Sequence, residues 1–182
     1  MLIGNVSEEG NRMSSRPSED EWHATLARGF GDSKATALIA AMKKKYPEKS
    51  IRLLSYGVNG ISSRNNVQGM VKLKCEQNGA HVYQYYFTWQ SPMLEDAGAW
   101  HTAELAFFDN TKRCEQGTGN TPEAQALAMK MATAWVNFAR TGNPSQPGLT
   151  WTPSDPSRCQ TMVFDNNCRM EDDPEGDLRR IL

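Results

Sequence analysis

The segment "VYQYYFTW", residues 82 to 89, carries the clearest strand signal in the chain. It consists mainly of aromatic and other strand-forming residues, which pack well on the pleated surface of a sheet. Ser91 and Pro92 follow it, and a proline here predicts that the strand has already ended. We therefore predict a strand over this segment, with a loop after it.

Two other segments also predict strands. Residues 1 to 6, "MLIGNV", form an apolar run that leads into the polar "SEEG" of residues 7 to 10. Residues 161 to 165, "TMVFD", form a short last strand. Because a buried strand usually has sequence before it, the apolar start leads us to expect that residues 1 to 182 are part of a larger domain.

Helical patterns occupy much of the sequence between the strands. Residues 19 to 30 and 34 to 47 show such patterns on either side of a "GDS" break, in which Asp32 or Ser33 is expected to cap the second helix. The lysines at 43 to 45 fit the exposed last turn of that helix, where cations complement the helix dipole. Residues 61 to 78 predict another helix.

The strongest helix signal lies between residues 121 and 142. Thr121 is suited to the N-cap, Pro122 to the first turn and Gly142 to the end. Its apolar stripe consists of Leu127, Met131, Trp135 and Phe138. Strands separated by helices predict the α/β class, in which helices cover a layered sheet.

Composition excludes several classes of partner. The chain has 182 residues, with 20 Lys and Arg against 21 Asp and Glu, so its charge does not indicate binding to nucleic acid or to an anionic membrane. It has no apolar run of the roughly 18 residues that a membrane helix needs. The first ten residues also lack the basic start and apolar core of a signal peptide, and the compartment stays open.

The cysteines do not predict a metal site. Four of them are spread along the chain without a C-x-x-C pair or a neighbouring histidine: Cys75, Cys114, Cys159 and Cys168. Up to two disulfides are compatible with this number. We predict no metal and no cofactor.

An acid and a histidine follow two of the predicted strands. Glu8 and Glu9 come directly after the first strand, and His101 follows the strand at 82 to 89. Loops at the carboxyl ends of strands build active sites in open α/β sheets. A histidine can move protons near neutral pH, and a carboxylate can orient its ring. By chemistry alone, either glutamate is a candidate for the acid.

The motif around these glutamates resembles that of the type B carboxylesterases, the family of para-nitrobenzyl esterases and cholinesterases. The family pattern G-x-x-x-[DE]-E-G is matched by Gly4, Glu8, Glu9 and Gly10. In the family the second glutamate is the acid of a catalytic triad. The resemblance therefore implies that Glu9 has this role here.

A second motif of the same family surrounds the histidine. The pattern G-x-x-H-x-x-E-[LI]-x-[FY] is matched by Gly98, His101, Glu104, Leu105 and Phe107. Three other segments agree in order, at 30 to 47, 82 to 92 and 135 to 151. The resemblance implies that His101 is the triad histidine. Glu104 is a candidate for a hydrogen-bond partner of this histidine, or for a carboxylate at the start of a helix.

The family also has segments for which this sequence shows no match. These are the glycine-rich oxyanion loop and the G-x-S-x-G turn that carries the nucleophilic serine. The "GDSKA" at 31 to 35 has Ala35 in place of the last glycine and no strand before it. The resemblance therefore implies that residues 1 to 182 are the C-terminal portion of an α/β-hydrolase domain, with the serine elsewhere.

The implied activity is hydrolysis of carboxylic esters through an acyl-enzyme, with a small-molecule ester as substrate. The implied partner is the N-terminal portion of the same enzyme, or a second copy that pairs with an exposed strand edge. The competing hypothesis is a non-catalytic module that keeps the esterase fold for binding or structure. The sequence does not identify the ester.

Overall fold

A computed structural model describes residues 1–10, 16–108 and 115–182. Its sheet has four strands in the order β1-β2-β3-β4. β1 (Leu2–Val6), β2 (Tyr83–Phe87) and β3 (Gln160–Phe164) are parallel, and β4 (Arg169–Asp172) is antiparallel to β3. The three predicted strands are confirmed. β4 was not predicted.

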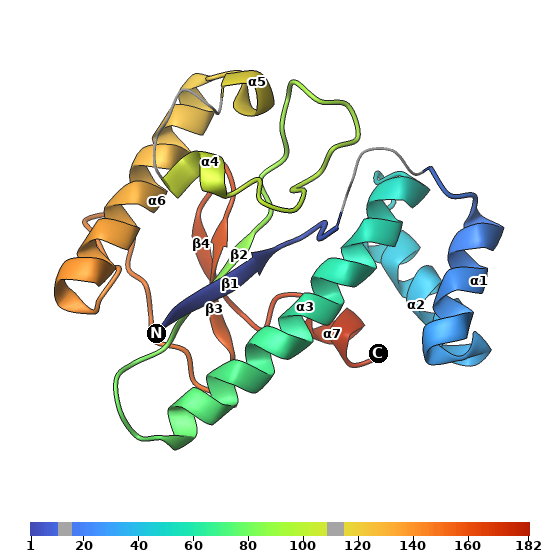
Figure 1. Cartoon of the computed structure of the whole chain (residues 1–182), viewed down its shortest axis with the longest axis horizontal. Coiled ribbons are helices and arrows are strands. Elements are labelled where there is room, and N and C mark those ends of the chain that lie inside the picture. The colour runs from blue at the N-terminus through green and yellow to red at the C-terminus, as the bar shows by residue number, and fades with distance from the viewer. Residues whose placement is uncertain (11–15, 109–114) are drawn as a thin grey trace.

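Four longer helices cover the sheet and one of its ends (Figure 1). They are α1 (Glu19–Phe30), α2 (Asp32–Lys45), α3 (Ile51–Glu76) and α6 (Pro122–Thr141). α3 crosses one face of the sheet and α6 lies on the other, while α1 and α2 pack beyond the carboxyl end of β1. Three short helices complete the described part: α4 (Leu105–Phe108), α5 (Glu115–Thr118) and α7 (Gly176–Arg179).

β2 contributes side chains to both faces of the sheet because successive side chains of a strand point to opposite faces. Tyr83 and Phe87 pack with Met131 of α6 and the other members of the larger apolar cluster. On the opposite face, Gln84 bonds with Gln68 of α3, where Nε2 of Gln68 is 2.9 Å from Oε1 of Gln84. A second apolar cluster joins α1, α2, α3 and α7.

The ends of α6 confirm their predicted caps. The Thr121 hydroxyl accepts a hydrogen bond from the Ala124 amide at 3.2 Å, and Gly142 has the left-handed φ of 77° that favours glycine at a helix end. The lysines at 43 to 45 form the last turn of α2, as predicted. Within the described ranges, no helix combines the length and apolar character needed to span a membrane.

Two predictions about local structure need correction. α3 starts at Ile51, ten residues before the predicted start. α2 begins at Asp32 with Gly31 as its N-cap, and no side chain caps it, so the predicted cap by Asp32 or Ser33 is wrong. Cys75, Cys159 and Cys168 are all free thiols, and Cys114 lies outside the described residues.

Candidate active site

The site is built where two loops continue the sheet beyond its carboxyl edge. The Ser7 amide donates to the Phe87 carbonyl at 3.0 Å, and the Glu8 amide donates to the Ala99 carbonyl at 3.1 Å. Glu8 and Trp100 also form a parallel bridge outside the named strands. The backbone therefore places the loop after β1 alongside the loop that precedes His101.

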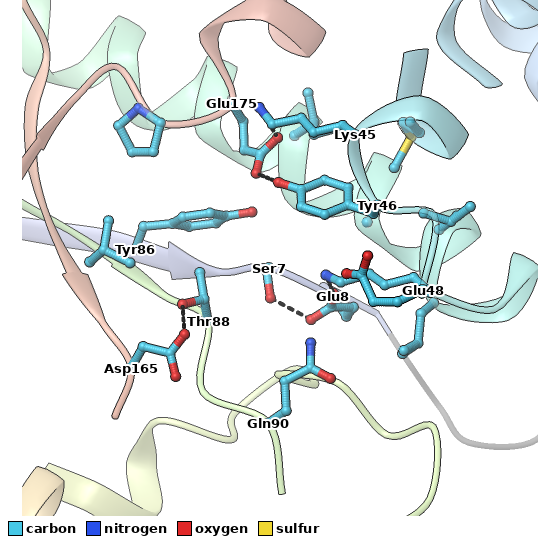
Figure 2. A pocket seen from close by; sticks show the side chains of 18 of the residues that line it. Ser7, Glu8, Lys45, Tyr46, Glu48, Tyr86, Thr88, Gln90, Asp165 and Glu175 are labelled. Carbon is cyan, nitrogen blue, oxygen red and sulfur yellow. Dashed lines mark hydrogen bonds and ion pairs between the residues drawn. The ribbon is translucent and has the colours of Figure 1, made fainter. Parts of the chain in front are cut away.

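Glu8 holds these two loops together through its buried side chain, which is 1% exposed. Its Oε2 accepts hydrogen bonds from the Ala99 amide at 2.8 Å and from the Ser7 hydroxyl, and its Oε1 accepts one from Lys49 Nζ at 2.8 Å. Figure 2 shows Glu8 beside Ser7. A buried carboxylate needs such partners because burial removes its water.

Gly98 packs directly against this carboxylate. Its φ is +61°, and a Cβ atom at this position would lie 2.8 Å from Cδ of Glu8. Only glycine provides both the left-handed backbone and the space. The packing of Glu8 therefore requires the glycine that the family motif has at position 98. The next residue, Ala99, donates its amide to the Glu8 carboxylate.

Glu9 is the glutamate that contacts the histidine. Its Oε2 lies 2.6 Å from Nδ1 of His101, while its backbone carbonyl accepts a hydrogen bond from Asn59 Nδ2 of α3 at 3.2 Å. A carboxylate accepts hydrogen bonds only, so this contact favours the tautomer with hydrogen on Nδ1. Nε2 of His101 then keeps a lone pair, and 66% of the side chain is exposed.

Glu104 lies near this pair without a direct hydrogen bond to the ring in the described part of the chain. Burial raises the pKa of the Glu104 carboxyl, and the negative charge of Glu9 raises it further. A hydrogen bond to the backbone of Glu104 and the charge of His101 lower the pKa, but by less. Oε2 of Glu104 is buried and finds no hydrogen-bond partner within the described residues. Burial, Glu104 and Glu9 also raise the pKa of the neighbouring Tyr85 phenol.

The arrangement is a histidine ring in contact with a carboxylate. Among residues 1–10, 16–108 and 115–182, no serine or cysteine makes a hydrogen bond with His101, and no group of three or more metal-ligating side chains comes together. The other histidines, His23 and His81, lie elsewhere. Lys49 and Asn59 were not foreseen as parts of this region, because neither belongs to a motif that sequence analysis could read.

Comparison with known proteins agrees with the geometry. Residues 7–177 match the sequence model of the carboxylesterase family. The chain belongs to the carboxylesterase family. The resemblance inferred from the motifs is thereby confirmed.

Two curated relatives of this carboxylesterase chain cover parts of it. The para-nitrobenzyl esterase of Bacillus subtilis (strain 168) is 32% identical over 106 residues, which are 57% of this chain and 22% of that protein. A pyrethroid hydrolase of Rattus norvegicus is 34% identical over 84 residues, which are 43% of this chain and 15% of that protein.

Solved esterase structures match nearly the whole chain. A carboxylesterase of Geobacillus stearothermophilus has a TM-score of 0.72 at 28% identity, covering 99% of this chain and 39% of its own. A para-nitrobenzyl esterase has a TM-score of 0.69 at 26% identity, covering 100% of this chain and 37% of its own. The predicted fold class is confirmed: the chain has part of an α/β-hydrolase fold and spans less than two fifths of these esterases.

Proposed function

We propose that Glu9 and His101 are the acid and the base of a serine-esterase triad that hydrolyses carboxylic esters. The observation that carries the proposal is the 2.6 Å contact between Glu9 Oε2 and His101 Nδ1. It occurs beyond the carboxyl ends of parallel strands, in a chain of the carboxylesterase family. Loops at this edge build active sites in open α/β sheets.

The proposed chemistry assigns a different task to each group. Nε2 of His101 takes the proton of a serine hydroxyl as that oxygen attacks the ester carbonyl, and then gives the proton to the leaving alcohol. Water repeats the sequence on the acyl-enzyme. Glu9 keeps the ring in the tautomer that leaves Nε2 free and stabilises the imidazolium that forms.

We further propose that the nucleophilic serine and the oxyanion donors come from esterase sequence outside residues 1 to 182. The matched esterases are more than twice as long as this chain, and His101 exposes most of its ring. A nucleophile needs hydrogen-bond reach of Nε2, and the exposed side of the ring leaves room for one. In this proposal Glu104 is a positioning residue beside the pair, and burial is the main cause of the raised pKa of its carboxyl.

β1 lies at an edge of the sheet in the described part of the chain. Among the described strands, β1 pairs with β2 and with no other strand. An unpaired edge exposes backbone amides and carbonyls that accept a further strand. We propose that this edge takes the N-terminal portion of the esterase, or a second copy when that portion is absent. A sharp, concentration-independent monomer in analytical ultracentrifugation of the isolated chain argues against the second copy.

The function is tested by labelling and turnover. The purified chain is incubated with a fluorophosphonate probe and para-nitrophenyl acetate, alone and mixed with the remaining N-terminal portion of a para-nitrobenzyl esterase. We expect neither labelling nor turnover from the chain alone, and both from the mixture. Labelling of the chain alone would show that it carries its own nucleophile.

Two substitutions identify the residues in the same assay. His101→Ala should abolish turnover of the mixture, and Glu9→Gln should lower it by about 10⁴-fold, since an amide no longer holds the required tautomer. If both variants assemble with the added portion yet retain full turnover, the pair is not catalytic and the chain acts as a binding or structural module.

A further inference from the structure

A cavity lies on the face of the sheet that α3 covers (Figure 2). Its lining includes Glu8, the neighbour of Glu9 in the chain, but neither Glu9 nor His101. Its volume is about 370 Å³, which is in the range of small-molecule sites. Ser7, Thr88 and Asp165 line it, and they follow β1, β2 and β3 respectively. The cavity therefore lies at the carboxyl ends of three parallel strands, where ligands bind in open α/β sheets.

One polar group that faces this cavity makes no hydrogen bond within the described residues. Tyr86 is 4% exposed, and Figure 2 shows its hydroxyl pointing into the cavity. No hydrogen bond to this hydroxyl is found within the described residues, although Arg64 lies over the ring face, 4.9 Å from its centroid. Burial, followed by the charges of Glu175 and Glu8, raises the pKa of the Tyr86 phenol, so the hydroxyl keeps its proton. It can donate to a ligand atom.

The charges on the cavity wall favour a cation. Five carboxylates and three cationic side chains line it. Glu8 and Glu175 have lysine partners, with nitrogen to oxygen distances of 2.8 Å to Lys49 and 3.3 Å to Lys45. Asp165 has none in the described part of the chain.

Asp165 is nevertheless held in a fixed position by neutral donors. Its Oδ2 accepts a hydrogen bond from the Thr88 hydroxyl at 3.1 Å, and its Oδ1 accepts one from the Asn166 amide at 2.7 Å. Two neutral donors orient the carboxylate but leave its charge unbalanced. A carboxylate of this kind attracts an ammonium group.

The rest of the cavity offers apolar surface to a ligand. Leu53, Leu54 and Ile61 contribute buried side chains to its wall. We propose that the cavity binds a small amine with an aromatic body and a hydroxyl group at the far end. The ammonium group contacts Asp165, the ring lies on the apolar wall, and the hydroxyl accepts a hydrogen bond from Tyr86.

This proposal does not rest on the proposed esterase chemistry, so it is tested on the isolated chain. The probe is tyramine, titrated against the ¹⁵N-labelled protein by NMR. Two analogues remove one feature each: phenethylamine lacks the hydroxyl, and 4-ethylphenol lacks the amine. We expect saturable shifts of the amides around Thr88 and Asp165, with tyramine binding about tenfold more tightly than 4-ethylphenol, since a charge-assisted hydrogen bond is lost.

Isosteric variants assign the contacts. Asp165→Asn should weaken tyramine binding by about tenfold, and Tyr86→Phe should do so by several fold and remove the preference over phenethylamine. Glu123→Gln, an acid at the start of α6, is the matched control and should change nothing. Thermal unfolding checks that each variant is folded.

Either of two results overturns the proposal. Equal affinities for tyramine and 4-ethylphenol would show that Asp165 does not select a cation. Absence of saturable shifts at millimolar tyramine would show that the cavity does not bind such an amine.

Discussion

Glu8 and Glu9 are adjacent in the chain, and their carboxylates bind partners on different elements. Oε1 of Glu8 lies 2.8 Å from Lys49 Nζ, whereas Oε2 of Glu9 lies 2.6 Å from Nδ1 of His101. Glu8 is also hydrogen-bonded to the Ala99 amide, two residues before the histidine. One glutamate therefore fixes the loop that carries the histidine, and the next orients the ring.

This division of roles predicts that Lys49→Met destabilises the chain. The substitution leaves the carboxylate of Glu8, which is 1% exposed, without its cation. Removing one partner of a buried pair costs roughly 3 kcal/mol. Urea denaturation should show a loss of this size, and the double variant with Glu8→Gln should lose less than the two single variants added together. A loss below about 0.5 kcal/mol, the usual surface effect, would contradict the buried pair.

Gly98→Ala should destabilise the same loop by about 2 kcal/mol, because alanine is strained at a φ of +61° and its Cβ would press on Glu8. Gly69→Ala is the matched control. Gly69 is an exposed position of α3 with nothing within 4 Å of an added Cβ, so alanine should stabilise the chain by roughly 0.5 to 1 kcal/mol. The two free energies of unfolding should change with opposite sign.

Sequence analysis succeeded where a local pattern carried the structure. The aromatic strand at 82 to 89 and the capped helix from Thr121 to Gly142 both depend on residues close together in the chain. It failed at the start of α3, since Gly57 and Gly60 lower helix propensity. Gly60 is there because a Cβ would overlap the Ser7 carbonyl, a tertiary contact that no local pattern shows.

The missed strand β4 has a related explanation. Its sequence is "RMED", and none of its four residues is fully buried, as expected for an antiparallel edge strand with little apolar alternation.

In the site, family motifs identified Glu9 and His101 as candidates, and the structure shows them in contact. Lys49 could not be found in this way, because the need for it arises only from the burial of Glu8.

Glu104→Gln should stabilise the chain above the ordinary pKa of a glutamate. Burial raises the pKa of this carboxyl in the folded state, so the folded chain holds the proton more tightly than the unfolded chain does. Stability is therefore lost as pH rises from the ordinary value of 4.5 through the raised pKa. Glutamine has no such titration. The difference in melting temperature between variant and wild type should grow with pH, and a constant difference from pH 4 to 8 would contradict the raised pKa.

His101→Ala should leave the stability of the isolated chain nearly unchanged. Its side chain is 66% exposed, and exposed substitutions change the free energy of unfolding by about 0.5 kcal/mol or less. His23→Ala is the matched control, since His23 lies on α1 and contacts Thr36 rather than Glu9. In the reconstituted esterase, only the His101 variant should lose turnover, while both variants should unfold near the wild-type temperature. Loss of folding in the His101 variant would mean that this histidine serves the structure of the loop, and its effect on turnover would then not report on proton transfer.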